Sequence, residues 1–105
     1  MYDFNIDTAE ELAARLAGNI QQRRLEKGLS RAALSRACGV PAPTIAKFEQ
    51  EHTISLLSFI SIAKELGYSD EIKSLLSEPK FSTIEELDLI NKNKNRKRGR
   101  DEKSR

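Results

Sequence analysis

The chain has very few of the side chains that build disulfides, metal sites and catalytic pairs. Its 105 residues include one cysteine, Cys38, one histidine, His52, and no tryptophan. A single cysteine excludes an intramolecular disulfide and any zinc site built on several cysteines. The two residues stand in separate segments, so we expect no metal and no other cofactor. We interpret Cys38 as a small, partly buried residue near a helix end and His52 as an exposed loop residue.

Long apolar stretches are also missing. No run approaches the roughly 18 consecutive apolar residues of a membrane-spanning helix. The first residues, Met1-Tyr2-Asp3-Phe4-Asn5, lack the basic and then apolar pattern of a signal peptide. No convergent set of acid, base and nucleophile is visible either. These absences predict a cytoplasmic protein that has no membrane partner and is not an enzyme.

Basic charge is concentrated at the C-terminal end. Residues 91–105 hold eight basic and two acidic side chains, a net charge of +6, whereas the rest of the chain has a net charge of −4. The densest part is the run Arg96-Lys97-Arg98-Gly99-Arg100. Such a tail favours a polyanionic partner, DNA or RNA first, although a solvated tail that only aids solubility is the alternative. Because residues 92–105 contain no apolar side chain, we predict that this tail is disordered.

The remaining pattern predicts helices and no clean strand. Five helices are expected, over residues 9–27, 31–38, 42–50, 56–66 and 70–77. Their starts are indicated by side chains that cap helices, namely Thr8 (with Glu11), Ser30, Ser55 and Ser69. Apolar spacing predicts the inward faces: Leu12, Leu16 and Ile20 in the first helix, with Ala13 and Ala17 beside them, and Leu56, Phe59, Ile60, Ala63 and Leu66 in the fourth. The chain is therefore predicted to be all-α.

The C-terminal part is expected to be organised differently. Pro79 interrupts the helical pattern, and a capping box at Ser82 and Glu85 predicts a short sixth helix. We divide the chain into an N-terminal arm (1–8), a domain of five helices (9–77), a short helical segment (78–91) and the basic tail (92–105).

The most informative segment is residues 28–50. Two short helices there are joined by Cys38-Gly39-Val40-Pro41, in which the glycine allows a sharp turn and Val40 can fill the core between the helices. This arrangement is typical of a helix-turn-helix unit, whose second helix enters the major groove of DNA.

The same segment carries a family resemblance. Residues 28–40, followed by Thr44-Ile45 and Phe48-Glu49, resemble the XRE family of lambda-repressor-like helix-turn-helix proteins. The resemblance covers about residues 16–77. It implies a five-helix lambda-repressor-like domain in a repressor that binds specific sequences of double-stranded DNA as a homodimer. It also implies a bacterial protein that associates with the nucleoid through DNA.

The resemblance implies which residues meet DNA: Arg31, Ala42, Pro43, Thr44 and Lys47. Arg31 begins the second helix and is expected to bind a phosphate. Ala42 and the Thr44 methyl group can contact a thymine methyl, and Lys47 can reach a guanine or a phosphate. The alternatives are Thr44 as a helix cap and Lys47 as a solvated side chain. The recognition helix has few long polar side chains, so we expect limited direct reading of bases and a larger share for DNA shape.

Arg24 and Glu49 match positions that form an internal ion pair in the family. Such a pair ties the first helix to the recognition helix. The alternative is two solvated charges of little energetic value.

The C-terminal layout, a short acidic helix before a basic tail, resembles HipB-like antitoxins. Proteins of that kind bind HipA-type kinase toxins and repress their own operon. A stand-alone phage-type or metabolic regulator fits nearly as well, and a protein-interaction module without DNA binding is a third hypothesis. For the homodimer, the candidate surface is Ile72, Leu75, Leu76 and Phe81, residues that could instead complete the core of a monomer.

Overall fold

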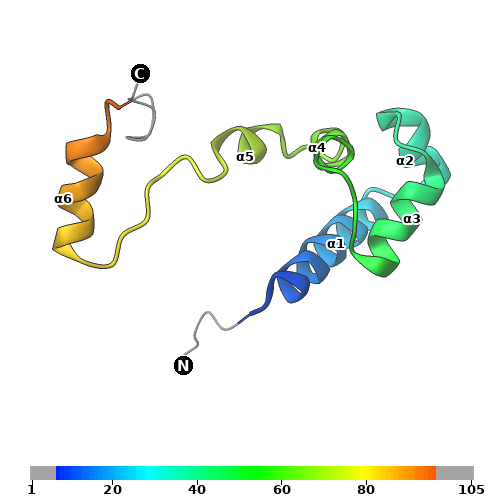
Figure 1. The fold of residues 1–105 in the computed structure, drawn as a ribbon. Coiled ribbons are helices and arrows are strands. Elements are labelled where there is room, and N and C mark those ends of the chain that lie inside the picture. Colours follow the sequence, from blue (N-terminus) through cyan, green and yellow to red (C-terminus); the bar gives the residue numbers. More distant parts are fainter. Residues whose placement is uncertain (1–6, 97–105) are drawn as a thin grey trace, which may run out of the picture. The chain divides into compact units, whose positions relative to one another are not determined.

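The computed structural model describes residues 7–96, and in this range the chain forms six α-helices and no strand. The helices are α1 (Ala9–Glu26), α2 (Arg31–Cys38), α3 (Ala42–Glu51), α4 (Leu56–Glu65), α5 (Ser69–Ser74) and α6 (Ile84–Asn93) (Figure 1). The predicted all-α class is confirmed. None of the described helices is long and apolar enough to cross a membrane. Most of the predicted N-terminal arm lies outside the described residues.

The chain divides into two compact units, Met1–Lys73 and Ser74–Arg105. The first unit contains α1 to α4 and all but the last residue of α5, and the second contains α6.

Side-chain caps begin three helices as their sequences predict. The Thr8 hydroxyl accepts a hydrogen bond from the Glu11 backbone N–H at 3.0 Å, and the Glu11 carboxylate accepts one from the Thr8 N–H at 2.9 Å. Ser30 and Ser55 cap α2 and α4, each accepting from the N–H three residues further on. These bonds satisfy N–H groups that the first turn of a helix otherwise leaves unpaired, so the starts of α1, α2 and α4 are fixed locally.

Several helix boundaries differ from prediction. The ends of α1, α3 and α4 are each one residue away from the predicted ends. α5 begins at Ser69, so the prediction that Ser69 caps it is wrong, and α6 extends to Asn93, two residues into the tail that was predicted to be disordered.

The caps and ends of α5 and α6 differ most. α6 is capped by Thr83, whose hydroxyl accepts from the Glu86 N–H, so the predicted box at Ser82 and Glu85 is one residue too early. α5 ends at Ser74 and not at residue 77, and Leu76 has a φ of 63°. Because Leu76 is 91% exposed, there is little burial to hold the helix through this residue.

The end of α3 gives His52 a role that its sequence context did not suggest. His52 is half-buried and takes a left-handed conformation, with a φ of 68°, as the C-terminal cap of α3. Its N–H donates to the Phe48 carbonyl at 2.8 Å. The prediction of an exposed loop residue is therefore wrong, whereas Cys38 lies half-buried at the end of α2 as predicted.

One core joins the helices of the first unit. α3 packs against α1 and α2, and α2 packs against α4. The buried apolar residues are Ala17, Ile20, Leu34, Val40, Ile45, Phe48, Ile62, Ala63 and Leu66. The Phe48 ring meets the Phe59 ring edge-on, with centroids 5.8 Å apart, an arrangement that aromatic rings favour. One face of α3 is thus fixed in the core, and the opposite face, with Lys47, is exposed.

The inward face of α1 is rotated from the predicted one. Leu12 and Leu16 are each 48% exposed, and the buried residues are Ala17, Ile20 and Arg24. Ile20 and the neighbouring Ala17 are buried as the apolar pattern predicted, whereas the prediction for Leu12 and Leu16 is wrong.

The inward face of α4 also differs from prediction. Leu56 is 72% exposed at the start of the helix, and Ile62, which was not predicted, is fully buried. Ala63 and Leu66 are buried and Phe59 packs against the core, as predicted. The packed residues follow the spacing of three and four that one helix face presents, and the predicted set began one turn too early.

The second unit has no core of its own among the described residues. No residue in the range 74–96 is buried. In α6, Leu87 and Ile90 are half-buried, while Ile84 and Leu89 are 68% and 56% exposed. A ten-residue helix with so little burial is marginal in water, so the Thr83 cap matters more here than a cap does in the first unit.

Candidate nucleic-acid interface

The turn between α2 and α3 is built from two neighbouring residues with different tasks. Gly39 ends α2 with a φ of 83°, a left-handed conformation that glycine adopts without strain. Val40, next to it, is 4% exposed and belongs to the same core as Leu34 and Ile45. The turn therefore fixes the start of α3 to the core through Val40 and leaves the opposite face of α3 exposed to solvent.

α3 begins with prolines. Pro41 is its N-cap and Pro43 lies in its first turn, where a missing N–H removes no helical hydrogen bond. The Pro41 carbonyl accepts from the N–H groups of Thr44 and Ile45 at 2.9 and 3.1 Å. No side chain caps this helix start, so the alternative that Thr44 serves as a helix cap is wrong.

The predicted DNA-binding residues of α3 lie on a hollowed surface. Pro43, Thr44 and Lys47 line one side of an open hollow. Pro43 and Lys47 are exposed, and Ala42 and Thr44 are half-buried. The other side of the hollow belongs to the segment after α3 and to the start of α4, through Thr53, Ile54, Ser55 and Ser58.

This second side was missed by reasoning from the sequence. Three of its residues, Thr53, Ser55 and Ser58, carry hydroxyls. The Ser55 hydroxyl accepts from the Ser58 N–H at 3.1 Å and keeps its own proton to donate. Hydroxyl groups commonly donate to phosphate oxygens in DNA complexes. The signal available in the sequence was a hydroxyl-rich connection directly after the recognition helix.

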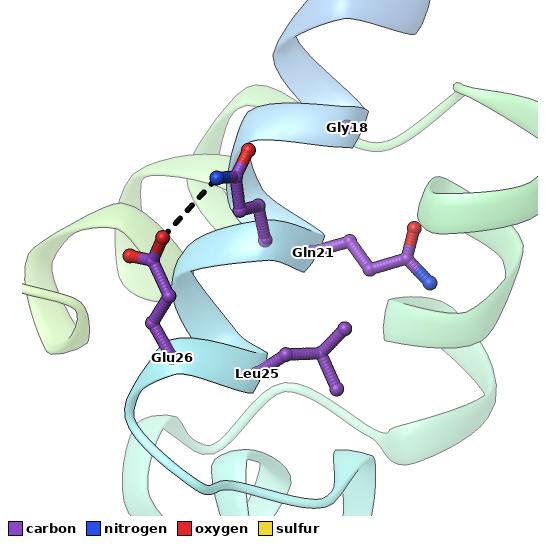
Figure 2. Close-up of a pocket in the computed structure, with 5 residues that line it drawn as sticks. Gly18, Gln21, Leu25 and Glu26 are labelled. Carbon is purple, nitrogen blue, oxygen red and sulfur yellow. Dashed lines mark hydrogen bonds between the residues drawn. The ribbon is translucent and has the colours of Figure 1, made fainter.

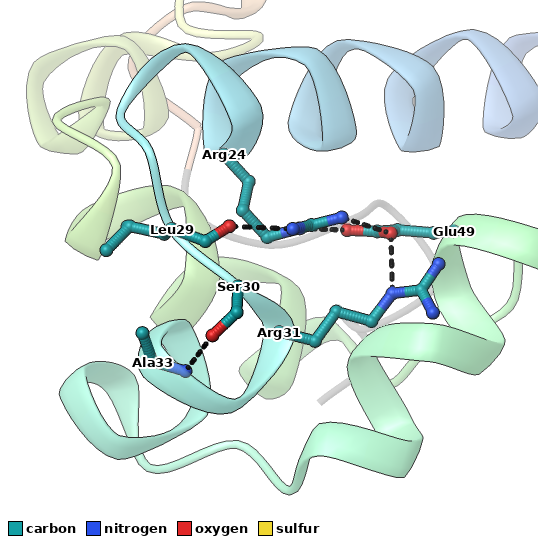
Figure 3. A network of polar contacts seen from close by, with 6 residues as sticks. All are labelled: Arg24, Leu29, Ser30, Arg31, Ala33 and Glu49. Carbon is teal, nitrogen blue, oxygen red and sulfur yellow. Dashed lines mark hydrogen bonds and ion pairs between the residues drawn. The ribbon is translucent and has the colours of Figure 1, made fainter.

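A buried polar network links α1, α2 and α3. The Arg24 guanidinium donates to Glu49 Oε2 from Nε at 2.7 Å and to Oε1 from Nη2 at 3.0 Å (Figure 3). Its Nη1 donates to the Leu29 carbonyl at 2.7 Å. The Glu49 side chain has no exposed area, and that of Arg24 is 7% exposed. The pair that the resemblance implied is thus buried and bidentate, and not two solvated charges.

Arg31 shares the same carboxylate. Its Nε donates to Glu49 Oε1 at 2.9 Å, and its side chain is 34% exposed. Burial raises the pKa of Glu49, but the hydrogen bonds and charges of Arg24 and Arg31 outweigh burial and hold that pKa below its ordinary value. The carboxylate is therefore ionised at neutral pH. Any phosphate contact of Arg31 has to be made by the terminal nitrogens of a guanidinium that is already tied to the protein.

A second hollow lies along α1. Its lining residues are Gly18, Gln21, Gln22, Leu25 and Glu26 (Figure 2). The Gln22 amide donates to the Glu26 carboxylate at 3.1 Å, and Arg23 pairs with the same carboxylate at 3.2 Å. These are exposed contacts within one helix and are worth little energetically. In the range that the structure describes, no group of His, Cys, Asp or Glu residues is arranged to hold a metal ion.

A family model described as helix-turn-helix matches residues 20–72. The matched range begins at the buried Ile20 and contains all of α2, α3 and α4. The chain belongs to this family. The helix-turn-helix unit is DNA-binding and of the XRE type, which is a regulatory and not a catalytic class. No curated protein and no solved structure matches the chain.

The residues proposed for dimerisation are spread over both units. Ile72 is half-buried and packs against the core of the first unit, which favours its role in completing the helix-turn-helix domain. Leu75, Leu76 and Phe81 belong to the second unit and are 61%, 91% and 49% exposed. The exposed candidates are therefore Leu75, Leu76 and Phe81, all of which follow α5 in the sequence.

The predicted basic DNA contacts fall at the edge of the described range. Arg96 is exposed, and its Nη1 donates to the Asn93 side-chain oxygen at 3.0 Å. Lys97, Arg98 and Arg100 lie outside the described residues.

Proposed function

We propose that this helix-turn-helix protein is a transcriptional repressor that binds specific sequences of double-stranded DNA through α3. One observation carries the proposal. The outer face of α3, with the half-buried Thr44 and the exposed Lys47, borders a hollow whose other side carries three hydroxyls. The N-terminal end of a recognition helix is the part that meets base edges, and lysine and hydroxyl groups beside it are suited to phosphates. Base contacts and backbone contacts are thus offered on one surface.

The side chains of this surface favour a restricted kind of base reading. Ala42 and the Thr44 methyl group fit against a thymine methyl, and Lys47 reaches guanine O6 or N7, or a phosphate. Lys47 is the one side chain of this set that can reach both guanine acceptors, and none of the set is an Asn or Gln that pairs with adenine. DNA shape and deformability therefore supply a larger part of the specificity than in a recognition helix rich in Arg and Asn.

The basic tail supplies affinity that is independent of sequence. Its net charge of +6 neutralises about six phosphates, which corresponds to a slope near −5 in a plot of log affinity against log salt. An Arg-Gly-Arg run can also follow a narrow A/T-rich minor groove, as basic arms do. Arg96, the first residue of the basic run 96–100, is exposed.

The repressor acts as a homodimer on DNA. One helix-turn-helix unit reads only a short half-site, and two-fold symmetry places two half-sites about 34 Å apart on one side of the duplex. Support for a dimer surface comes from Leu75, Leu76 and Phe81, which remain exposed in a unit that has no buried residue within its described range.

Selection of bound sequences from a random pool of duplexes, at a fixed salt concentration, tests this function. We expect enrichment of a two-fold symmetric sequence with half-sites separated by about one helical turn. Enrichment of a single half-site would contradict the dimer and leave the DNA-binding function intact. Recovery of no preferred sequence, with no duplex affinity at moderate salt, would instead support an interaction module that does not bind DNA.

A second candidate function is that of a HipB-like antitoxin that represses its own operon. The observation that favours it is the concentration of exposed apolar side chains in residues 75–89, which suits a protein partner. The test is a titration with a purified HipA-type kinase. Binding that is lost in an Ile84→Ser/Leu89→Ser variant, which keeps the proposed dimer residues, would support this role. No binding at micromolar concentration would leave a stand-alone XRE regulator.

A further inference from the structure

The Glu49 carboxylate binds one more guanidinium than a simple internal ion pair requires. Its Oε2 accepts from Arg24 Nε, while its Oε1 accepts from both Arg24 Nη2 and Arg31 Nε. Two guanidiniums around one carboxylate leave the network with a net charge of +1. That excess charge sits at the start of α2, because Arg31 is the first residue of this helix.

The two arginines differ in how many of their guanidinium nitrogens are left to bind a ligand. Arg24 uses all three of its nitrogens, two on Glu49 and one on the Leu29 carbonyl, and is 7% exposed. Arg31 uses only Nε, and its side chain is 34% exposed. Within the described residues, no protein acceptor takes a hydrogen bond from its terminal nitrogens Nη1 and Nη2. Figure 3 shows the Nε of Arg31 facing the carboxylate and the terminal pair of nitrogens at the far end of the side chain.

We propose that Glu49 is a positioning residue for Arg31, and that together they form a preorganised clamp for one phosphate of the DNA backbone. The buried carboxylate holds the Nε edge of Arg31, and the fork of Nη1 and Nη2 remains for two parallel bonds to phosphate oxygens. A side chain that is already fixed loses less rotamer freedom when it binds. This inference rests on the proposed DNA-binding function and assigns one part of it.

The clamp also connects phosphate binding to the recognition helix. Glu49 belongs to α3, Arg31 to α2 and Arg24 to α1. A phosphate held by Arg31 is therefore coupled, through one carboxylate, to the element that carries Thr44 and Lys47. In a duplex complex, the register of α3 in the major groove is set in part by this contact.

The network is asymmetric in a way that makes the clamp testable. If Arg31 is replaced, Glu49 keeps its bidentate pair with Arg24, and no buried charge is left unpaired. Variants of Arg31 therefore fold, and their DNA affinities can be compared directly. Arg36, exposed in the last turn of the same helix, provides a control that removes the same charge.

The experiment is a titration of the full chain with its selected duplex over a range of salt concentrations. For Arg31→Gln we expect the salt slope to fall by about 0.9 per half-site and the affinity to drop at least about ten-fold, because a charge-assisted bond is lost. Arg31→Lys keeps the slope but binds more weakly than the wild type, since an ammonium lacks the fork and its Nε anchor. Arg36→Gln changes both quantities less. Equal slopes and affinities for Arg31→Gln and Arg36→Gln would overturn the clamp.

The role of Glu49 has its own readout in the free protein. We expect a resolved, slowly exchanging Arg31 Nε–H resonance in ¹H–¹⁵N spectra, which Glu49→Gln moves toward the position of exposed arginines. If Glu49→Gln does not fold, the wild-type spectrum decides alone, and a fast-exchanging Arg31 Nε–H would overturn the positioning role. Absence of duplex binding by the wild-type chain would instead contradict the proposed function, a result that this spectrum distinguishes.

Discussion

The two units of this protein are stabilised in different ways. Residues 7–73 bury nine apolar side chains and a paired carboxylate in one core, whereas residues 74–96 bury none. The second unit nevertheless carries half of the ten exposed large apolar residues: Leu75, Leu76, Phe81, Ile84 and Leu89. The first unit is thus specified by its own packing, whereas the described part of the second unit has no apolar core. A substitution of the same chemical kind should have different effects in the two units.

Two carboxylates give the largest expected contrast. Glu49 and Glu86 both have a lowered pKa, Glu49 in spite of its burial and Glu86 through hydrogen bonds from Ser82 on an exposed surface. Glu49→Ala strands the buried Arg24 guanidinium, and we expect it to lower the free energy of unfolding by roughly 3–5 kcal/mol. Urea denaturation measures this loss. Glu86→Ala is the control, and an equally small effect of both variants would show that the Arg24 pair is solvated.

Apolar truncation gives the next contrast. Ile62 is fully buried, whereas Leu89 is 56% exposed. Ile62→Ala is expected to cost roughly 2–5 kcal/mol through lost burial and a residual cavity, and Leu89→Ala less than about 0.5 kcal/mol. Thermal unfolding at low protein concentration compares the two. A large effect of Leu89→Ala under these conditions would mean that the second unit has a core after all.

Acid titration should affect the first unit through Glu49. Because its folded-state pKa is lowered from 4.5, the stability that it contributes is fully present above about pH 4.5 and is lost as the pH falls through the lower folded value. We expect denaturation midpoints to change little between pH 7 and 5 on account of this group, and to fall below pH 4.5. In Glu49→Gln the fall should be shallower. An identical acid profile in the variant argues against the network.

The smallest effect on stability is expected from removing the tail. A chain that ends at residue 91 loses the last two residues of α6, but it should nearly keep the melting temperature of the wild type, because none of residues 92–96 is buried. Its DNA affinity should depend much less on salt, while the preferred sequence stays the same. An unchanged salt slope would show that the tail does not contact DNA.

The elements of the first unit were largely predictable from the sequence. The hydroxyls of Thr8, Ser30 and Ser55 cap the starts of α1, α2 and α4 through hydrogen bonds to backbone N–H groups three residues further on. Gly39 ends α2. Such signals act within a few residues, so a sequence read along the chain contains them. The family could also be predicted, from residues 28–50, and the family model that matches residues 20–72 confirms it.

The faces of the helices were harder to predict, because they depend on contacts between distant residues. Leu12 and Leu16 looked like core residues, yet each is 48% exposed, and of the predicted leucine and isoleucine stripe only Ile20 is buried. The hydrogen bond from Arg31 to the Glu49 carboxylate could not be predicted either, since residues 31 and 49 come together only when α2 packs against α3. The α3 residues of the proposed DNA-binding surface could be named from the sequence. The hydroxyl-bearing residues on the other side of the hollow were found only in the structure.

DNA recognition by the outer face of α3 is the property on which the proposed function depends most. Its most direct test is a titration of the selected duplex, at fixed salt, with the wild-type chain and with Thr44→Ala/Lys47→Ala. Lys47 is exposed and Thr44 makes no cap bond, so the double variant should keep its melting temperature. We predict that it binds the selected duplex at least about ten-fold more weakly and discriminates less against unrelated duplexes. Unchanged affinity and unchanged discrimination in a folded variant would contradict the account.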